Sequence, residues 1–159
     1  MRRLRLTEGE RSVAMAYIGI GLFGAGLAFN VVNGLGGSDN ILRPLTPYDF
    51  WMIASGALGA DLGLYLSRNR FGHPGAAGAA MALLGALLLT FSATIIAGTL
   101  ALPGYGTMFG LLAVGVSFWS SPFLALVWTI MLAACHLLFA IWRRERDTLF
   151  VILDDGIPV

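Results

Sequence analysis

Charged residues are scarce in this sequence and are missing from one long stretch of it. Only 12% of the 159 residues are Asp, Glu, Lys or Arg, and 57% are hydrophobic, whereas an ordinary soluble domain carries about 25% charged residues. No charged residue lies between Arg70 and Arg143, and a water-facing protein surface does not tolerate such a gap. The composition therefore predicts an integral membrane protein.

The residues that commonly build reactive sites are also few. Cys135 is the single cysteine, which excludes an internal disulfide and a CxxC motif. The only histidines are His73 and His136, and they fall at different depths, so a bis-histidine haem is not expected. HExxH, paired carboxylates and a phosphate-binding glycine loop are lacking. We predict no catalytic residue, no metal and no cofactor beyond lipid contacts, and a net charge of +1 gives no reason to expect a nucleic-acid partner.

Four apolar runs are each long enough to cross a bilayer, which takes about 20 residues of helix. They cover residues 12–33, 48–67, 75–101 and 121–142. The first run is too long for a signal peptide and has no convincing cleavage site after it, so we expect it to be retained. The sequence predicts an all-α membrane bundle of four transmembrane helices that forms one domain over residues 1–159.

The arginines predict how this bundle is oriented. Short cytoplasmic loops keep basic residues and short external loops do not. Nine of the ten arginines lie on one side if both termini and the 68–74 turn are cytoplasmic, and only Arg43 lies outside. The nine are Arg2, Arg3, Arg5, Arg11, Arg68, Arg70, Arg143, Arg144 and Arg146. Four crossings satisfy this distribution, whereas three or five do not.

Residues 107–120, TMFGLLAVGVSFWS, are apolar but too short to cross. We expect either an interfacial helix or a re-entrant segment before the last span. The alternative is a third span that extends beyond residue 101, followed by a shorter connector.

Small residues recur at helical spacing and predict close helix packing. Ser55, Gly59 and Gly63 form a stripe with a period of four residues on the second run, and Gly21 and Ala25 begin a similar stripe on the first. In lipid, helices associate through close backbone approach, which small residues permit.

Asp61 is the one charged residue well inside a predicted span. It lies seven residues before Arg68, or about 10 Å inward at about 1.5 Å of rise per residue. His136 lies seven residues before Arg143 on a span of the same direction, and Tyr17 reaches nearly the same level. Counting from the arginines thus predicts that Asp61, His136 and Tyr17 share one depth.

Two interpretations of these three residues remain open. An intramembrane carboxylate with an imidazole and a phenol is typical of a site that binds or relays a proton or cation. Alternatively, each residue makes one interhelical hydrogen bond and fixes the packing. Hydroxyls of the third run are candidates for a polar path together with Asn30 and Asn33: Thr90, Ser92, Thr94 and Thr99.

The predicted cytoplasmic tail, residues 143–159, contains an apolar run that we expect to be shielded from water. The run comprises Leu149, Phe150, Val151, Ile152 and Leu153. It could lie on the headgroups, fold back onto the bundle, or dock onto a partner protein. We interpret it as a partner-docking segment.

Two hypotheses for function follow. The first is a non-catalytic accessory or structural subunit that packs against a larger membrane protein complex, in a multi-pass protein of a bacterial inner membrane. The second is a small proton- or ion-coupled transporter or channel-like homo-oligomer that uses Asp61 and His136.

Overall fold

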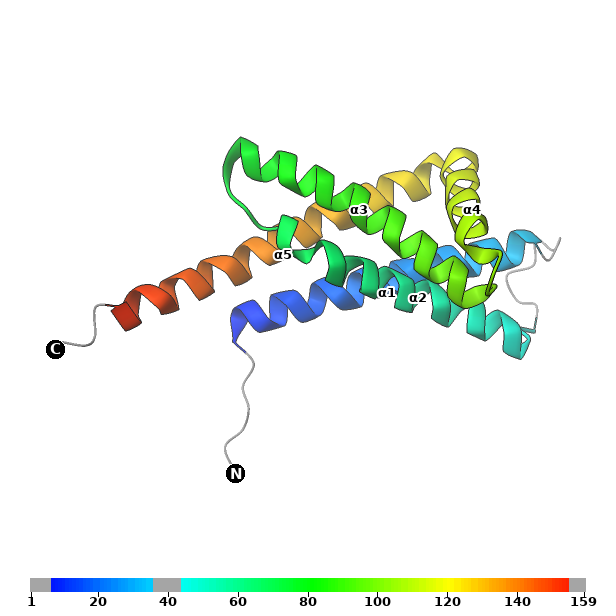
Figure 1. The fold of residues 1–159 in the computed structure, drawn as a ribbon, viewed down its shortest axis with the longest axis horizontal. Coiled ribbons are helices and arrows are strands. Elements are labelled where there is room, and N and C mark those ends of the chain that lie inside the picture. Colours follow the sequence, from blue (N-terminus) through cyan, green and yellow to red (C-terminus); the bar gives the residue numbers. More distant parts are fainter. Residues whose placement is uncertain (1–6, 36–43, 155–159) are drawn as a thin grey trace, which may run out of the picture.

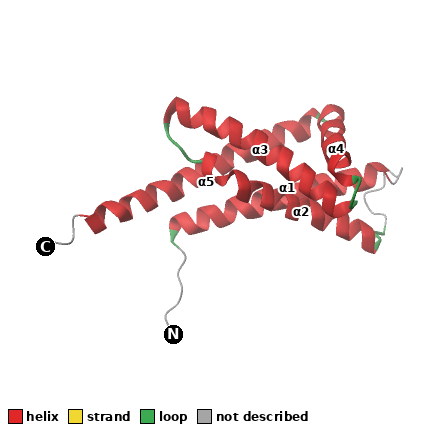
Figure 2. Ribbon diagram, viewed as in Figure 1, coloured by secondary structure: helices red, strands yellow, loops and turns green. Residues whose placement is uncertain are grey.

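Most of the residues that the structure describes are helical. The computed structural model describes residues 7–35 and 44–154, without the side chains of residues 35 and 149–154. In this part the structure is 90% helix and contains no strand. The elements, in chain order, are α1 (Glu8–Leu35), α2 (Pro47–Ser67), the 3-10 turn η1 (Arg68–Arg70), α3 (Gly75–Ala101), α4 (Gly106–Ser120) and α5 (Pro122–Asp154) (Figures 1 and 2). The predicted all-helical fold class is confirmed.

Three helices are long and apolar enough to cross a membrane, which makes the chain a membrane protein. They are Glu8–Gly34, Gly75–Ala101 and Pro122–Thr148, and they correspond to the first, third and fourth predicted runs. α2 coincides with the second run but is not among the three, and it carries Asp49 and Asp61. The count of four spans therefore stays a prediction.

Two helices begin where short polar motifs satisfy their first amides. Before α1, the Thr7 hydroxyl accepts from the Glu10 amide and the Glu10 carboxylate accepts from the Thr7 amide, at 3.2 and 2.9 Å. Thr46 and Asp49 make the same reciprocal pair before α2, at 3.2 and 2.8 Å. Each pair is a capping box, which supplies acceptors to amides that the helix itself leaves unpaired. α1 consequently begins at Glu8, four residues before the predicted span.

α2 lies between α1 and α3, and glycines bring the three backbones together. A Cβ atom at Gly24 or at Gly56 would press on the carbonyl oxygen of the other glycine, so α1 and α2 meet there without side chains between them. On α2, Gly59 and Gly63 lie against the backbone of α3 in the same way. Close approach of this kind replaces the hydrophobic driving force that is missing between helices in lipid.

The 107–120 segment forms one uninterrupted helix, α4, of 15 residues. It crosses the end of α3 at a steep angle (Figure 1). Gly98 of α3 and Gly106 of α4 touch through their backbones, and a Cβ on either would overlap the other's carbonyl oxygen. The third helix ends at Ala101, so the alternative of a longer third span is not what the structure shows.

α5 packs on α1 and reaches α3 through one polar contact. The indole of Trp128 donates to the hydroxyl of Thr90 at 3.0 Å, and Phe139 and Cys135 are buried in the central core. The helix continues to Asp154, well past the predicted span end at residue 142. The first part of the predicted tail is thus a helical extension of α5, and the side chains of Leu149 to Leu153 lie outside the described residues.

Candidate functional site

Asp61 lies at the contact between α2 and α1, opposite a glycine. A Cβ atom at Gly21 would lie 2.9 and 3.1 Å from the two carboxylate oxygens of Asp61. Gly21 therefore provides the space that the carboxylate occupies. The Asp61 Oδ1 atom is buried and has no hydrogen-bond partner among the described residues. An unpaired buried carboxylate oxygen loses its hydration without compensation, which is costly for the ionised form.

Tyr17 is the titratable neighbour of Asp61 from α1. It lies four residues before Gly21, which places both residues on one face of the helix. The Tyr17 side chain lies within electrostatic range of Asp61, Cys135 and Arg68. Residues of α1, α2 and α5 thus place a phenol within electrostatic range of an acid and a thiol. A carboxyl group beside a phenol can hold a proton in more than one arrangement.

His136 lies elsewhere, against the turn that joins α2 to α3. Its Nδ1 atom accepts a hydrogen bond from the Gly72 amide at 3.1 Å. Arg143 supports the same turn, because its Nε donates to the Phe71 carbonyl at 2.8 Å and its Nη2 to the Asn69 carbonyl at 2.9 Å. The turn needs glycine at residue 72, where φ is +83° and the backbone of Phe139 leaves no space for a Cβ. His136 and Arg143 thus hold α5 to the turn.

Tyr17 lies on the α1 face that Gly21 presents to Asp61, whereas the structure forms no hydrogen bond between Asp61 and His136 within the described residues. The shared depth of Asp61, His136 and Tyr17 stays a prediction. Arg143 reaches back along α5 with a long side chain to the turn carbonyls, while His136, seven residues earlier, reaches the same turn. His136 therefore lies at the level of the turn, and Cys135 is the α5 residue that faces the core near Tyr17.

The small residues predicted to pack helices lie on or near the α1–α2 and α2–α3 contacts. Ser55 is buried and donates to the Trp51 carbonyl at 2.8 Å, and Gly59 and Gly63 face α3. Gly21 faces Asp61, whereas Ala25 is only half-buried, and its neighbour Gly24 makes the backbone contact with α2.

The hydroxyls predicted as a polar path are bonded within their own helix. Thr90, Ser92, Thr94 and Thr99 each donate to a carbonyl three or four residues earlier, at 2.6 to 2.9 Å. Thr90 and Thr94 line a cavity of about 90 Å³ whose other walls are apolar and come from all five α-helices. Asn30 is exposed, and neither Asn30 nor Asn33 lines this cavity.

One polar contact that joins distant parts of the chain was not predicted. The Gly9 amide, in the first turn of α1, donates to the Glu145 carboxylate of α5. A carboxylate is favoured there because the amides at a helix N-terminus carry partial positive charge. Residue 9 has to be small, since a Cβ atom would meet both Glu145 and Trp142. Sequence alone offered only a weak signal, a glycine between two acidic residues.

Comparison with known proteins assigns no role to these residues. No family model, curated protein or solved structure matches the chain. Within the described residues, no group of three or more His, Cys, Asp or Glu side chains is placed to hold a metal ion.

Proposed function

We propose that the protein is a four-span membrane bundle with both termini in the cytoplasm, in the bacterial inner membrane, and that it acts as a non-catalytic accessory subunit of a larger membrane complex. The bundle and its tail would form a single domain. The proposal has two parts, the membrane topology and the accessory role, and each has its own support and test.

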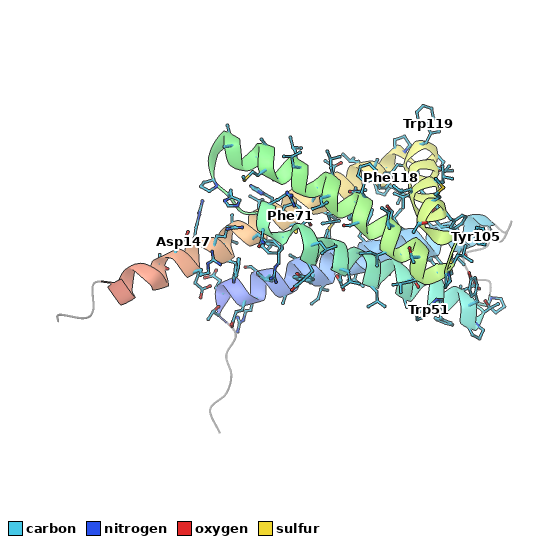
Figure 3. All side chains as sticks on the ribbon, in the orientation of Figure 1. Trp51, Phe71, Tyr105, Phe118, Trp119 and Asp147 are labelled. Atoms are coloured by element: carbon cyan, nitrogen blue, oxygen red, sulfur yellow. The ribbon has the colours of Figure 1, made fainter. Side chains whose placement is uncertain are left out.

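Contacts between helix ends support the proposed membrane topology. Glu145 meets Gly9 and Arg143 meets the turn after α2, so the arginine-bearing ends of α1, α2 and α5 gather at one end. At the other end, the Trp51 indole donates to the Leu100 carbonyl at 2.9 Å, which joins the start of α2 to the end of α3. Figure 3 displays Trp51, Tyr105 and Trp119 at the end opposite Asp147. This separation fits an aromatic belt at one membrane face and a basic collar at the other.

The position of α2 explains how it could cross despite its two carboxylates. It packs on α1 along one side and on α3 along the other. Protein contacts on both sides reduce the surface that lipid must cover, and a polar residue is tolerated in a span when it faces neighbouring helices. Asp61 does so, since it faces Gly21.

Cysteine labelling in intact cells tests the proposed membrane topology. Cys135, which is buried, is first replaced in Cys135→Ala, and Thr7→Cys, Thr148→Cys and Pro103→Cys are then made one at a time, Pro103 being exposed between α3 and α4. A membrane-impermeant maleimide should label Pro103→Cys in intact cells, and should label the other two only after lysis. Labelling of Thr7→Cys and Thr148→Cys from opposite sides would contradict the four-span arrangement.

The outward face of α4 is the observation that carries the accessory role. This α4 outer face consists of exposed, uncharged, mostly large side chains: Tyr105, Met108, Leu112, Val116 and Trp119. Trp119 is 91% exposed and Met108 is 76% exposed, although α4 is too short to cross the bilayer alone. Protein interfaces are enriched in Trp, Tyr and Met and depleted of charge. An apolar helix of a larger subunit would cover this face.

Recovery of the complex from native membranes tests this role. In gentle detergent, the chain should be recovered in fixed proportion with larger subunits, and Trp119→Ala should reduce that recovery about tenfold or more, as for an interface hot spot. Leu84→Ala is the matched control, because Leu84 is also exposed but lies on α3. Recovery of the chain alone from native membranes, or equal recovery of both variants, would contradict the accessory role.

One observation favours the second candidate, a proton- or ion-coupled transporter. Asp61 Oδ1 is buried and has no hydrogen-bond partner in the part of the chain that the structure describes, and Tyr17 lies within electrostatic range. Buried ionisable groups in membrane spans often bind or relay protons. The cavity among the five α-helices is lined almost entirely by apolar groups, so this function would require a homo-oligomer.

Proton flux into proteoliposomes tests this candidate. The purified chain should conduct protons measurably above empty vesicles, Asp61→Asn should abolish the flux, and Tyr17→Phe should reduce it. Asp49→Asn is the control, since Asp49 belongs to the capping box of α2. Flux that is absent from the unchanged protein, or equal in Asp61→Asn, would exclude the transport role.

A further inference from the structure

A cavity with both charged and apolar lining residues lies at the arginine-bearing end of the bundle, between α5 and the turn that precedes α3. Its volume is about 300 Å³, at the lower end of small-molecule sites, which are roughly 300–1,000 Å³. The charged and titratable residues that line it are His73, His136, Arg143, Arg144 and Asp147. This cavity is separate from Asp61 and from the α4 outer face.

Most of the charged and titratable side chains that line this cavity are hydrogen-bond donors. Arg143 uses Nε and one Nη2 hydrogen on the turn carbonyls, and a guanidinium has five N–H donors, so three remain. His136 accepts the Gly72 amide at Nδ1, so its neutral ring carries the proton on Nε2 and can donate from there. Arg144 is exposed and adds a second guanidinium, whereas Asp147 is the one acid among the lining residues.

The start of α3 adds to the positive field. Gly75, the first residue of α3, lines the cavity, and Pro74 before it provides no side-chain cap to the first amides. The helix dipole places partial positive charge at this end. The cavity thus combines two guanidiniums, an imidazole donor and a helix N-terminus, which is the chemistry that binds a phosphate group.

The cavity also opens toward the apolar surface of the bundle. Leu137 lines it and is 64% exposed, on a helix that is long and apolar enough to cross the membrane. A phosphate group in the cavity could therefore continue into an acyl chain along Leu137. Basic pockets between transmembrane helices on the cytoplasmic side bind anionic headgroups in other membrane proteins.

We propose that this cavity binds the phosphate of an anionic membrane phospholipid, with Arg144 and Arg143 on the phosphate oxygens and the acyl chain along Leu137. Bound lipid would fill the space between α5 and the turn, and it would tie α5 to the start of α3. A free phosphate shares the recognition chemistry and differs only in lacking the acyl chain. The accessory role is not needed for this inference.

Native mass spectrometry of the full-length chain in neutral detergent tests the proposal. The probes are dioleoylphosphatidylglycerol, the zwitterionic dioleoylphosphatidylcholine and inorganic phosphate. The unchanged protein should bind phosphatidylglycerol in preference to phosphatidylcholine. Millimolar inorganic phosphate should not displace the bound phosphatidylglycerol.

Two arginine variants of equal charge locate the binding. Arg144→Gln should weaken phosphatidylglycerol binding about tenfold, as expected for loss of a charge-assisted hydrogen bond. Arg146→Gln is the matched control, since Arg146 stacks on Trp142 with its guanidinium carbon 4.9 Å from the ring and does not line the cavity. Both arginines are exposed, so neither change should prevent folding. Asp147→Asn should increase binding.

Three results would overturn the proposal. Equal binding of both lipids would show that the cavity does not select an anionic headgroup, and equal weakening by Arg144→Gln and Arg146→Gln would show that the lipid does not bind in this cavity. Displacement of the lipid by inorganic phosphate, with the same dependence on Arg144, would replace the lipid by a free phosphate as the ligand.

Discussion

Two polar regions of the bundle are built in opposite ways. At the 68–74 turn, the carbonyls of Asn69 and Phe71 and the amide of Gly72 all receive partners from α5. At the contact of α1 and α2, the carboxylate of Asp61 is in contact with a glycine, and its Oδ1 atom has no partner in the described part of the chain. Polar residues in the first region fasten helices together, whereas Asp61 is accommodated at a cost in stability. Such a cost is expected where a residue is retained for function.

Removal of Arg143 should have the largest effect on stability. In Arg143→Met the two turn carbonyls lose charged donors, and hydrogen bonds to charged groups contribute about 1.5–3 kcal/mol each. We expect the free energy of unfolding in mixed micelles to fall by about 3 kcal/mol. Arg146→Met, which removes only an exposed contact with Trp142, should cost about 1 kcal/mol or less. Equal losses in the two variants would mean that Arg143 does not hold the turn.

Removal of the His136 acceptor should have the next largest effect. His136→Leu leaves the buried Gly72 amide without its partner, and an unsatisfied buried donor costs about 1–3 kcal/mol. We expect a loss of about 2 kcal/mol in the same unfolding measurement. His136→Asn keeps an acceptor near the position of Nδ1 and should restore most of it. A failure of Asn to restore stability would argue that the imidazole acts through packing.

Filling the space beside Asp61 should have a smaller effect. In Gly21→Ala the new methyl group meets both carboxylate oxygens, and we expect a loss of about 1 kcal/mol from overpacking. The matched control is Gly26→Ala on the same helix, where a Cβ meets nothing within 4 Å. This control should be neutral or more stable by up to about 1 kcal/mol, because alanine is the better helix former. Equal stability of the two variants would place the carboxylate elsewhere.

Neutralising Asp61 should have the smallest effect. Asp61→Asn removes a charge without breaking a hydrogen bond to a described residue, so the unfolding free energy should change by less than about 1 kcal/mol, and an increase is expected. Thermal unfolding of the two proteins side by side in one detergent measures this. A loss of more than about 2 kcal/mol would reveal a stabilising partner, and it would end the contrast between the two polar regions.

Helices were predictable from this sequence because long apolar runs leave few other structures possible in lipid. The start of α1 at Glu8 was also readable in principle, since Thr7 and Glu10 have the spacing of a capping box. The contact of His136 with the 68–74 turn was not predictable, because it depends on tertiary hydrogen bonds between α5 and the turn that no sequence spacing indicates. The glycine contact at Gly24 was hidden for another reason: several glycines between residues 19 and 26 offer alternative faces, and only the packed partner selects one.

The bond between Gly9 and Glu145 joins residues 136 positions apart, which has a consequence for biosynthesis. The ribosome delivers α1, α2, α3 and α4 before α5 exists, so during translation the Gly9 amide in the first turn of α1 lacks the Glu145 acceptor. The bundle can reach its final arrangement only when α5 emerges and slides into place beside α1. A nascent chain stalled before Glu145 should therefore be the form most exposed to quality-control proteases.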